Sequence, residues 1–182
     1  MLLLVVRAFL VAVALGALAG IAAPAPTFAG APDLRGGAFL ALGEQLAHVE
    51  LLNPVPARDL SALESQLGVQ VLQFQHQHPG PYTTLTAGGV VSPGQSLAVA
   101  ADQHLANQAR WFTVKLASLE ALSRDLGGQR RLALLRTIED IKVAQADFEQ
   151  NGARVNRLVV RGVPEAIAAL ASKPNVASVG VK

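Results

Sequence analysis

The sequence lacks cysteine altogether, and it is poor in aromatic residues, with one tryptophan and one tyrosine among its 182 residues. Without thiols, the chain forms no disulfide, no thiolate nucleophile and no cysteine-ligated metal site. The lack of cysteine also excludes a lipoprotein-type lipid anchor. The folded part must therefore be held together by core packing alone.

Charged residues are also scarce, at 15% of the chain, and the two signs nearly balance at 15 basic and 13 acidic residues. This balance excludes the dense positive charge of a nucleic-acid-binding protein, so no nucleic-acid partner is expected. Hydrophobic residues make up 51% of the chain, which excludes intrinsic disorder of the whole. No Gly-x-Ser-x-Gly, phosphate-binding loop or His-Glu-x-x-His motif is present, so the sequence predicts no enzyme and no cofactor.

The first 23 residues are apolar except for Arg7. Residues 8–23 fit the hydrophobic region of a secretory signal, and the small residues before position 30 favour cleavage after Ala29. The sequence therefore predicts a signal peptide over residues 1–29. The alternative is a retained membrane anchor formed by residues 2–23. In both cases the remainder is expected outside the cytoplasm, secreted, periplasmic or in the cell envelope.

Residues 30–45 are rich in glycine and read as a linker, which leaves residues 46–182 as one domain. Two stretches of that domain, 47–78 and 154–182, share one pattern. Each has an extended apolar run, a Val-Pro pair, a short amphipathic helix and a second strand. Leu60 and Leu63 of the first helix match Ile167 and Leu170 of the second. Two such β-α-β units predict an α+β fold with a four-stranded antiparallel sheet of the ferredoxin-like type.

A long excursion separates the two units. Residues 82–91 are expected to form a hairpin or an ordered loop. A helix is expected to start at Ser92, which is followed by Pro93 and Gln95, and to run to Leu126. A second helix is expected over residues 129–150, so the sequence predicts a helical hairpin inserted at about 93–150.

His76 and His78 are the only pair that resembles metal chemistry, because residues two apart on a strand share a face. His48 or His104 would have to complete the ligand set, because two histidines are too few for zinc. The sequence therefore predicts no metal site, with His76 and His78 as the candidates if one exists. The simpler interpretation is a polar strand end that runs into the turn at Pro79.

Four residues of the hairpin are candidates for binding a partner. Trp111 and Phe112 could anchor one, and the alternative is that they pack against the second helix. Arg130 and Arg131 start the second helix, where cations oppose the helix dipole, so they could serve an acidic protein or an anionic headgroup. The alternative for these arginines is a solvated face.

The strand at Leu158-Val159-Val160-Arg161-Gly162, the helix at residues 164–172 and the run Pro174-Asn175-Val176-Ala177-Ser178-Val179 resemble the last β-α-β portion of the inhibitor I9 family, the subtilisin propeptide-like domains. The resemblance covers about a sixth of the chain. It implies a ferredoxin-like fold and, as an activity, protease inhibition or propeptide-like chaperoning. That family binds its protease through a C-terminal tail beyond the last strand, and this sequence stops at Lys182. The chain also looks like a small exported bacterial protein.

Three functions remain open at this point. The first is a non-enzymatic binding or scaffolding module at the cell envelope, which would act through a protein partner or self-association. The second is a stand-alone protease inhibitor or chaperone. The third is a small-ligand or metal-binding domain that uses His76 and His78.

Overall fold

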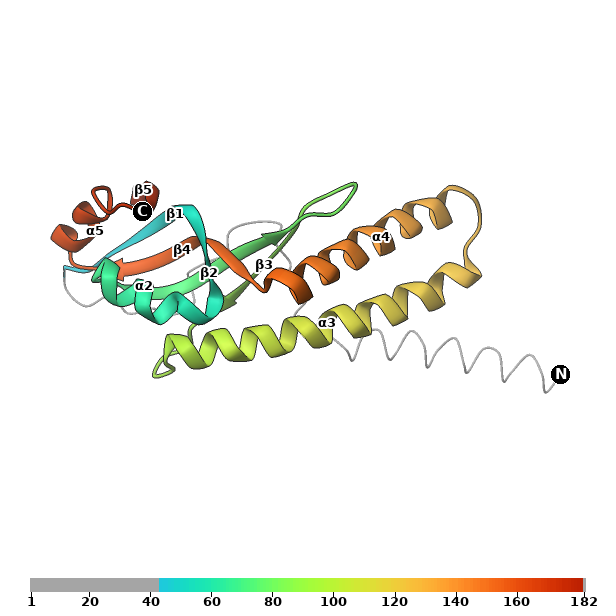
Figure 1. Cartoon of the computed structure of the whole chain (residues 1–182), viewed down its shortest axis with the longest axis horizontal. Coiled ribbons are helices and arrows are strands. Elements are labelled where there is room, and N and C mark those ends of the chain that lie inside the picture. The colour runs from blue at the N-terminus through green and yellow to red at the C-terminus, as the bar shows by residue number, and fades with distance from the viewer. Residues whose placement is uncertain (1–42, 182) are drawn as a thin grey trace. The chain divides into compact units, whose positions relative to one another are not determined.

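Side chains alternate between buried and exposed over residues 47–52, in the first strand of the sheet. The computed structural model describes residues 43–181, all within one compact unit. In order, the elements are β1 (Gln45–Pro56), the 3-10 turn η1 (Ala57–Asp59), α2 (Leu60–Leu67), β2 (Gln70–His78), β3 (Leu85–Val90), α3 (Leu97–Asp125), α4 (Gly128–Asn151), β4 (Arg154–Gly162), α5 (Pro164–Leu170) and β5 (Val176–Val181). Figure 1 shows the sheet with α3 and α4 running away from one end of it.

The expected signal peptide, the alternative anchor and most of the expected linker lie outside the described residues. Within residues 43–181, no helix combines the length and the apolar character needed to span a bilayer.

The sheet is antiparallel and has five strands in the order β3-β2-β4-β1-β5. The prediction of four strands was therefore one short. The additional strand is β3, which turns back along β2 and extends the edge. The expected hairpin or ordered loop over residues 82–91 is instead this single strand, which pairs with β2.

One face of the sheet carries the main core. On β1, Ala47, Val49 and Leu51 are buried, whereas His48 and Glu50 between them are exposed. The short helices α2 and α5 cover the buried face with Leu60 and Leu63 from the first, and with Ile167 and Leu170 from the second. These four residues are the ones that the two-unit pattern places in equivalent positions, and all four are buried.

The start of the long helix differs from the expectation. Ser92 and Gln95 do pair, since the Gln95 side chain accepts from the Ser92 backbone N–H at 3.1 Å, but they close a turn rather than a helix. The helix begins at Leu97, and its cap is Ser96, whose hydroxyl accepts from the Val99 N–H at 3.3 Å. Gly94, with φ of +78°, lies in the turn between the two serines.

Gly89 on β3 is held against the ring of Phe74 on β2, and a Cβ there would overlap that ring. Gly89→Ala is therefore expected to lower the free energy of unfolding by about 2 kcal/mol, because Phe74 is fully buried and has no room to move. Gly180→Ala on β5 is the matched control, since a Cβ there meets no atom within 4 Å, and its change should stay within about 0.5 kcal/mol. Urea unfolding of both variants measures the difference, and equal values would contradict the tight contact.

Candidate functional site

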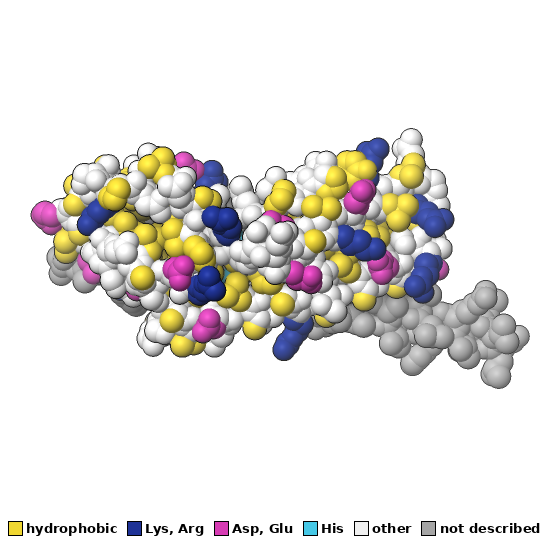
Figure 2. Space-filling view, viewed as in Figure 1, with side chains coloured by type: hydrophobic (Ala, Val, Ile, Leu, Met, Phe, Trp, Pro, Cys, Tyr) yellow, Lys and Arg dark blue, Asp and Glu magenta, His cyan; other side chains and the backbone are white. Residues whose placement is uncertain are grey.

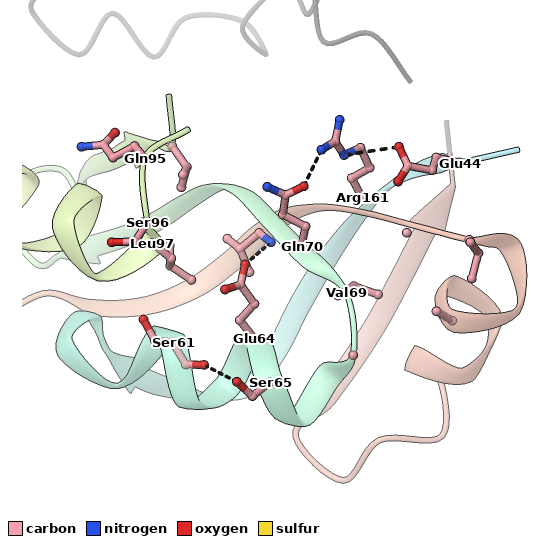
Figure 3. A pocket seen from close by; sticks show the side chains of 16 residues that line it. Glu44, Ser61, Glu64, Ser65, Val69, Gln70, Gln95, Ser96, Leu97 and Arg161 are labelled. Atoms are coloured by element: carbon pink, nitrogen blue, oxygen red, sulfur yellow. Dashed lines mark hydrogen bonds and ion pairs between the residues drawn. The ribbon is translucent and has the colours of Figure 1, made fainter. Parts of the chain in front are cut away.

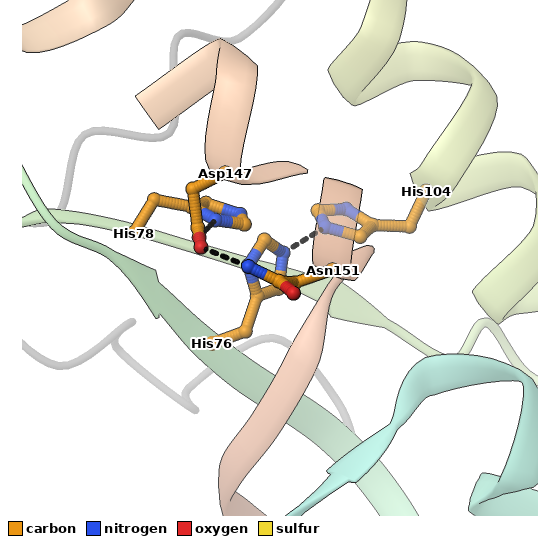
Figure 4. Close-up of polar contacts among 5 residues, drawn as sticks. All are labelled: His76, His78, His104, Asp147 and Asn151. Carbon is orange, nitrogen blue, oxygen red and sulfur yellow. Dashed lines mark hydrogen bonds and ion pairs between the residues drawn. The ribbon is translucent and has the colours of Figure 1, made fainter. Parts of the chain in front are cut away.

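Three histidines meet where the helices α3 and α4 leave the sheet. His76 and His78 share the core face of β2, and His104 reaches them from α3 (Figure 4). The ring centroids lie 4.8 Å apart for His76 and His78, and 5.0 Å apart for His76 and His104. The polar strand end that the sequence shows is therefore part of an interior cluster.

Two short hydrogen bonds tie this histidine cluster (His76, His78, His104) to the two long helices. The Nε2 atoms of His76 and His104 are 2.7 Å apart. Nδ1 of His78 lies 2.7 Å from Oδ2 of Asp147 on α4, and the other oxygen of Asp147 accepts from the Asn151 amide at 2.7 Å. The cluster thus joins β2, α3 and α4 through side-chain hydrogen bonds.

Aromatic rings surround the cluster. Phe74 packs edge-on against His104, and both Phe112 and Phe148 pack against His78. His76 and His78 are buried to 0% and 1% exposure. Nδ1 of His76 and Nε2 of His78 are buried and have no hydrogen-bond partner among the described residues.

This environment favours the neutral forms of His76 and His104. Burial, together with the neighbouring His104 and His78, lowers the pKa of His76 to about 3, against a partial offset from Asp147. Burial and the neighbouring His78 lower the pKa of His104 to about 4. For Asp147, burial raises the pKa, but the hydrogen bonds from His78 and Asn151 outweigh it and the net shift is downward. The carboxylate therefore stays ionised where the two histidines stay neutral.

The structure brings one of the two further histidines close to His76 and His78. Of the two histidines proposed to complete the pair, His104 does approach it, whereas His48 lies on the exposed side of β1. Within residues 43–181, no three His, Asp, Glu or Cys side chains are arranged so that they could hold one metal ion. Asp147 was not singled out from the sequence, because it lies 69 residues beyond His78.

The four candidate partner-binding residues separate into two groups. Phe112 is fully buried in a small second core with Ile141 and Ala144, so it presents no surface to a partner. Its neighbour Trp111 is half-buried and packs on that same core. Arg130 and Arg131 are exposed in the first turn of α4.

A second buried polar contact fixes the loop before β3. Asp140 on α4 is 2% exposed and accepts from the backbone N–H groups of Tyr82 at 2.8 Å and Thr83 at 3.2 Å. Asp140→Ala is expected to lower the free energy of unfolding by about 2 kcal/mol, because the backbone N–H groups of Tyr82 and Thr83 lose their carboxylate acceptor. Asp140→Asn keeps one acceptor oxygen, so it should cost about 1 kcal/mol. Urea midpoints check the order, and an equal loss in both variants would contradict this anchoring role.

The described residues also form an open hollow of about 640 Å³ between α2, the start of β2 and the turn before α3 (Figure 3). Its polar groups already bond to one another. Glu64 accepts from the Val71 N–H at 2.7 Å, and Arg161 contacts both Gln70 and Glu44. No convergent set of uncommitted polar groups marks this hollow as a ligand site.

Comparison with protein-family models, with curated proteins and with solved structures gives no match.

Proposed function

We propose that this chain is an exported, non-enzymatic binding module with a ferredoxin-like core. Its contact surface is the outer part of the inserted helical hairpin, residues 110–137, here called the arm, and its partner is a protein with an acidic surface at the cell envelope. The order β2-β4-β1-β5 within the sheet supports the ferredoxin-like interpretation. In that interpretation β3 is an added edge strand, and α3 with α4 is the insertion.

The observation that carries this proposal is that the arm beyond Phe112 has almost no core of its own, with Leu116 and Leu119 only partly buried against the second core. Of residues 113–137, only Ser123 is buried. Large apolar side chains are exposed there instead, with Leu132 at 60% and Leu122 at 46%. The two helices continue well beyond their buried contacts, and a pair of helices gains most of its stability from packing an apolar face. An added partner surface would supply that packing.

Charge favours one kind of partner over the others. Residues 110–137 contain six basic and two acidic residues, although the whole chain carries a net charge of only +2. Figure 2 shows Lys and Arg side chains interspersed with hydrophobic ones over this end of the molecule. Two copies of the arm would repel each other, whereas an acidic protein surface would be attracted to it.

The alternative of a stand-alone protease inhibitor accounts for the last β-α-β portion of the chain, but it gives the arm no role. For the metal-binding alternative, no three donor side chains among residues 43–181 are arranged so that they could hold one metal ion. The arm is therefore the feature on which the proposed function is based.

Site-specific crosslinking in the native cell tests the proposal. A photoreactive phenylalanine analogue at Leu132 is expected to capture one protein repeatedly, through an acidic segment of that protein. The same analogue at Leu52, which is equally exposed at 59% but lies on β1, should capture none. Capture of a second copy of the chain, of lipid, or of the same proteins from both positions would overturn the proposal.

Charge reversal gives the matching prediction. The double variant Arg130→Glu and Arg131→Glu should reduce capture from position 132 at least tenfold, because it removes attraction and adds repulsion. Both residues are exposed, so the unfolding free energy should change by less than about 0.5 kcal/mol. Arg58→Glu at an exposed position near the sheet is the control, and its capture should equal that of the wild type.

A further inference from the structure

The histidine cluster lies at the only place where β2, α3 and α4 are joined by side-chain hydrogen bonds among the described residues. Most of the core of the sheet lies away from the cluster. That core consists of residues such as Leu60, Val71 and Val160, with α2 and α5 packed above the strands, and the start of α3 adds Leu97 and Ala101 to it. A change in the cluster therefore acts first on the junction between the long helices and the sheet.

The contact between His76 and His104 depends on the number of protons it holds. Its two Nε2 atoms are 2.7 Å apart, so one of them must carry hydrogen and the other must accept. One additional proton places an imidazolium in the buried pair, where the ring of Phe74 packs against His104. A second additional proton places hydrogen on both Nε2 atoms, so neither can accept and the hydrogen bond between them is lost.

The charged groups around the cluster offset the added positive charge only in part. Asp147 from α4 is the anion nearest to the cluster, and it already accepts from His78 and from Asn151. Arg154, at the start of β4, acts on Asp147 as an opposing positive charge. From β2 and α3, the facing titratable groups are the histidines themselves, which repel one another once they are charged.

We propose that the histidine cluster is an acid-sensitive latch: proton uptake by His76 and His104 separates the sheet-side parts of α3 and α4 from β2, while the sheet with α2 and α5 stays folded. The latch needs no partner for the arm, so it stands or fails independently of the proposed function. The low pKa values of the two histidines agree with a closed latch at neutral pH.

Hydrogen exchange on the full-length protein tests the latch. Between pH 7.5 and pH 4.5, after correction for intrinsic exchange, amides in residues 104–112 and 138–151 should lose at least tenfold in protection. Amides in α2, β1 and β4 should keep theirs. A uniform loss across the domain, or no loss in the helices, would overturn the latch.

Variants and histidine titrations complete the test. His104→Gln removes one of the two proton acceptors, so helix opening should move at least half a pH unit lower. His48→Gln removes an exposed histidine from the other side of β1 and should leave the midpoint unchanged. If His104→Gln does not fold, NMR titration of the wild-type imidazole signals decides. His76 and His104 signals that titrate near pH 6.5 without helix opening would refute the latch.

Discussion

Phe112→Ala is expected to lower the free energy of unfolding by about 4 kcal/mol, which is among the largest losses a single truncation causes in a small domain. Phe112 is 0% exposed and lies at the centre of the second core, where Ile141 and Ala144 pack beside it and Phe148 contacts its ring. Its ring also touches that of His78, so its removal opens a cavity beside the cluster. Urea or thermal unfolding measures the loss.

Two control variants show whether this loss comes from packing. Phe112→Leu keeps most of the volume and should cost about 1 kcal/mol. Val114→Ala lies two residues further along the same helix at 41% exposure, and it should change stability by less than about 0.5 kcal/mol. If Phe112→Ala left stability unchanged, the side chain would not be part of a core, and its expected role as a partner anchor would return.

The second large effect is a fall in stability on acidification, of about 4 kcal/mol between pH 8 and pH 5. The folded-state pKa values of His76 and His104 are about 3 and about 4, below the unfolded value of 6.5. The unfolded chain therefore binds more protons, and stability rises with pH in this range. The stabilisation is fully present above pH 6.5 and is lost progressively as the pH falls toward 4 and then 3.

The size of the effect follows from the distance between pH 5 and the unfolded pKa of 6.5. At about 1.4 kcal/mol per pH unit, each of the two neutral histidines accounts for about 2 kcal/mol. The pKa of Asp147 is lowered, so its contribution to stability is lost only as the pH falls below the usual aspartate range near 4. It therefore adds nothing to the change between pH 8 and pH 5. Urea unfolding at half-unit pH steps measures the curve.

His104→Gln should halve the slope of that curve between pH 6 and pH 5, because one proton site disappears from the buried set. His48→Gln should leave the slope as it is. A wild-type curve that is flat over this window would mean that the two histidines bind protons equally well in the folded and unfolded chain.

Local sequence patterns were enough to predict most of the elements. The strand at Val176–Val181 and the two long helices follow from periodicity and from the residues that end them. The equivalence of Leu60 with Ile167 and of Leu63 with Leu170 led to the two-unit interpretation, and all four residues are buried together. Such positions are recognisable because their signal lies within one short segment.

Only half of the candidate site could be predicted from the sequence. His76 and His78 share a strand face by simple alternation, so their pairing is visible from the sequence. His104 and Asp147 join them only through the way in which α3 and α4 leave the sheet, 28 and 69 residues away along the chain. Strand β3 was ambiguous for a similar reason: its two glycines are poor strand formers, and close packing on Phe74 requires them.

The packing of the two cores does not depend on the length of the arm. Residues 120–134 bury only Ser123, so they add no apolar side chain to either core. Paired removal or addition of two helical turns, one stretch on each side of Gly127, would change the reach of the hairpin by about 10 Å at 1.5 Å per residue. The sheet would keep its packing throughout. The fold thus allows the length of the arm to change without loss of apolar packing in the domain itself.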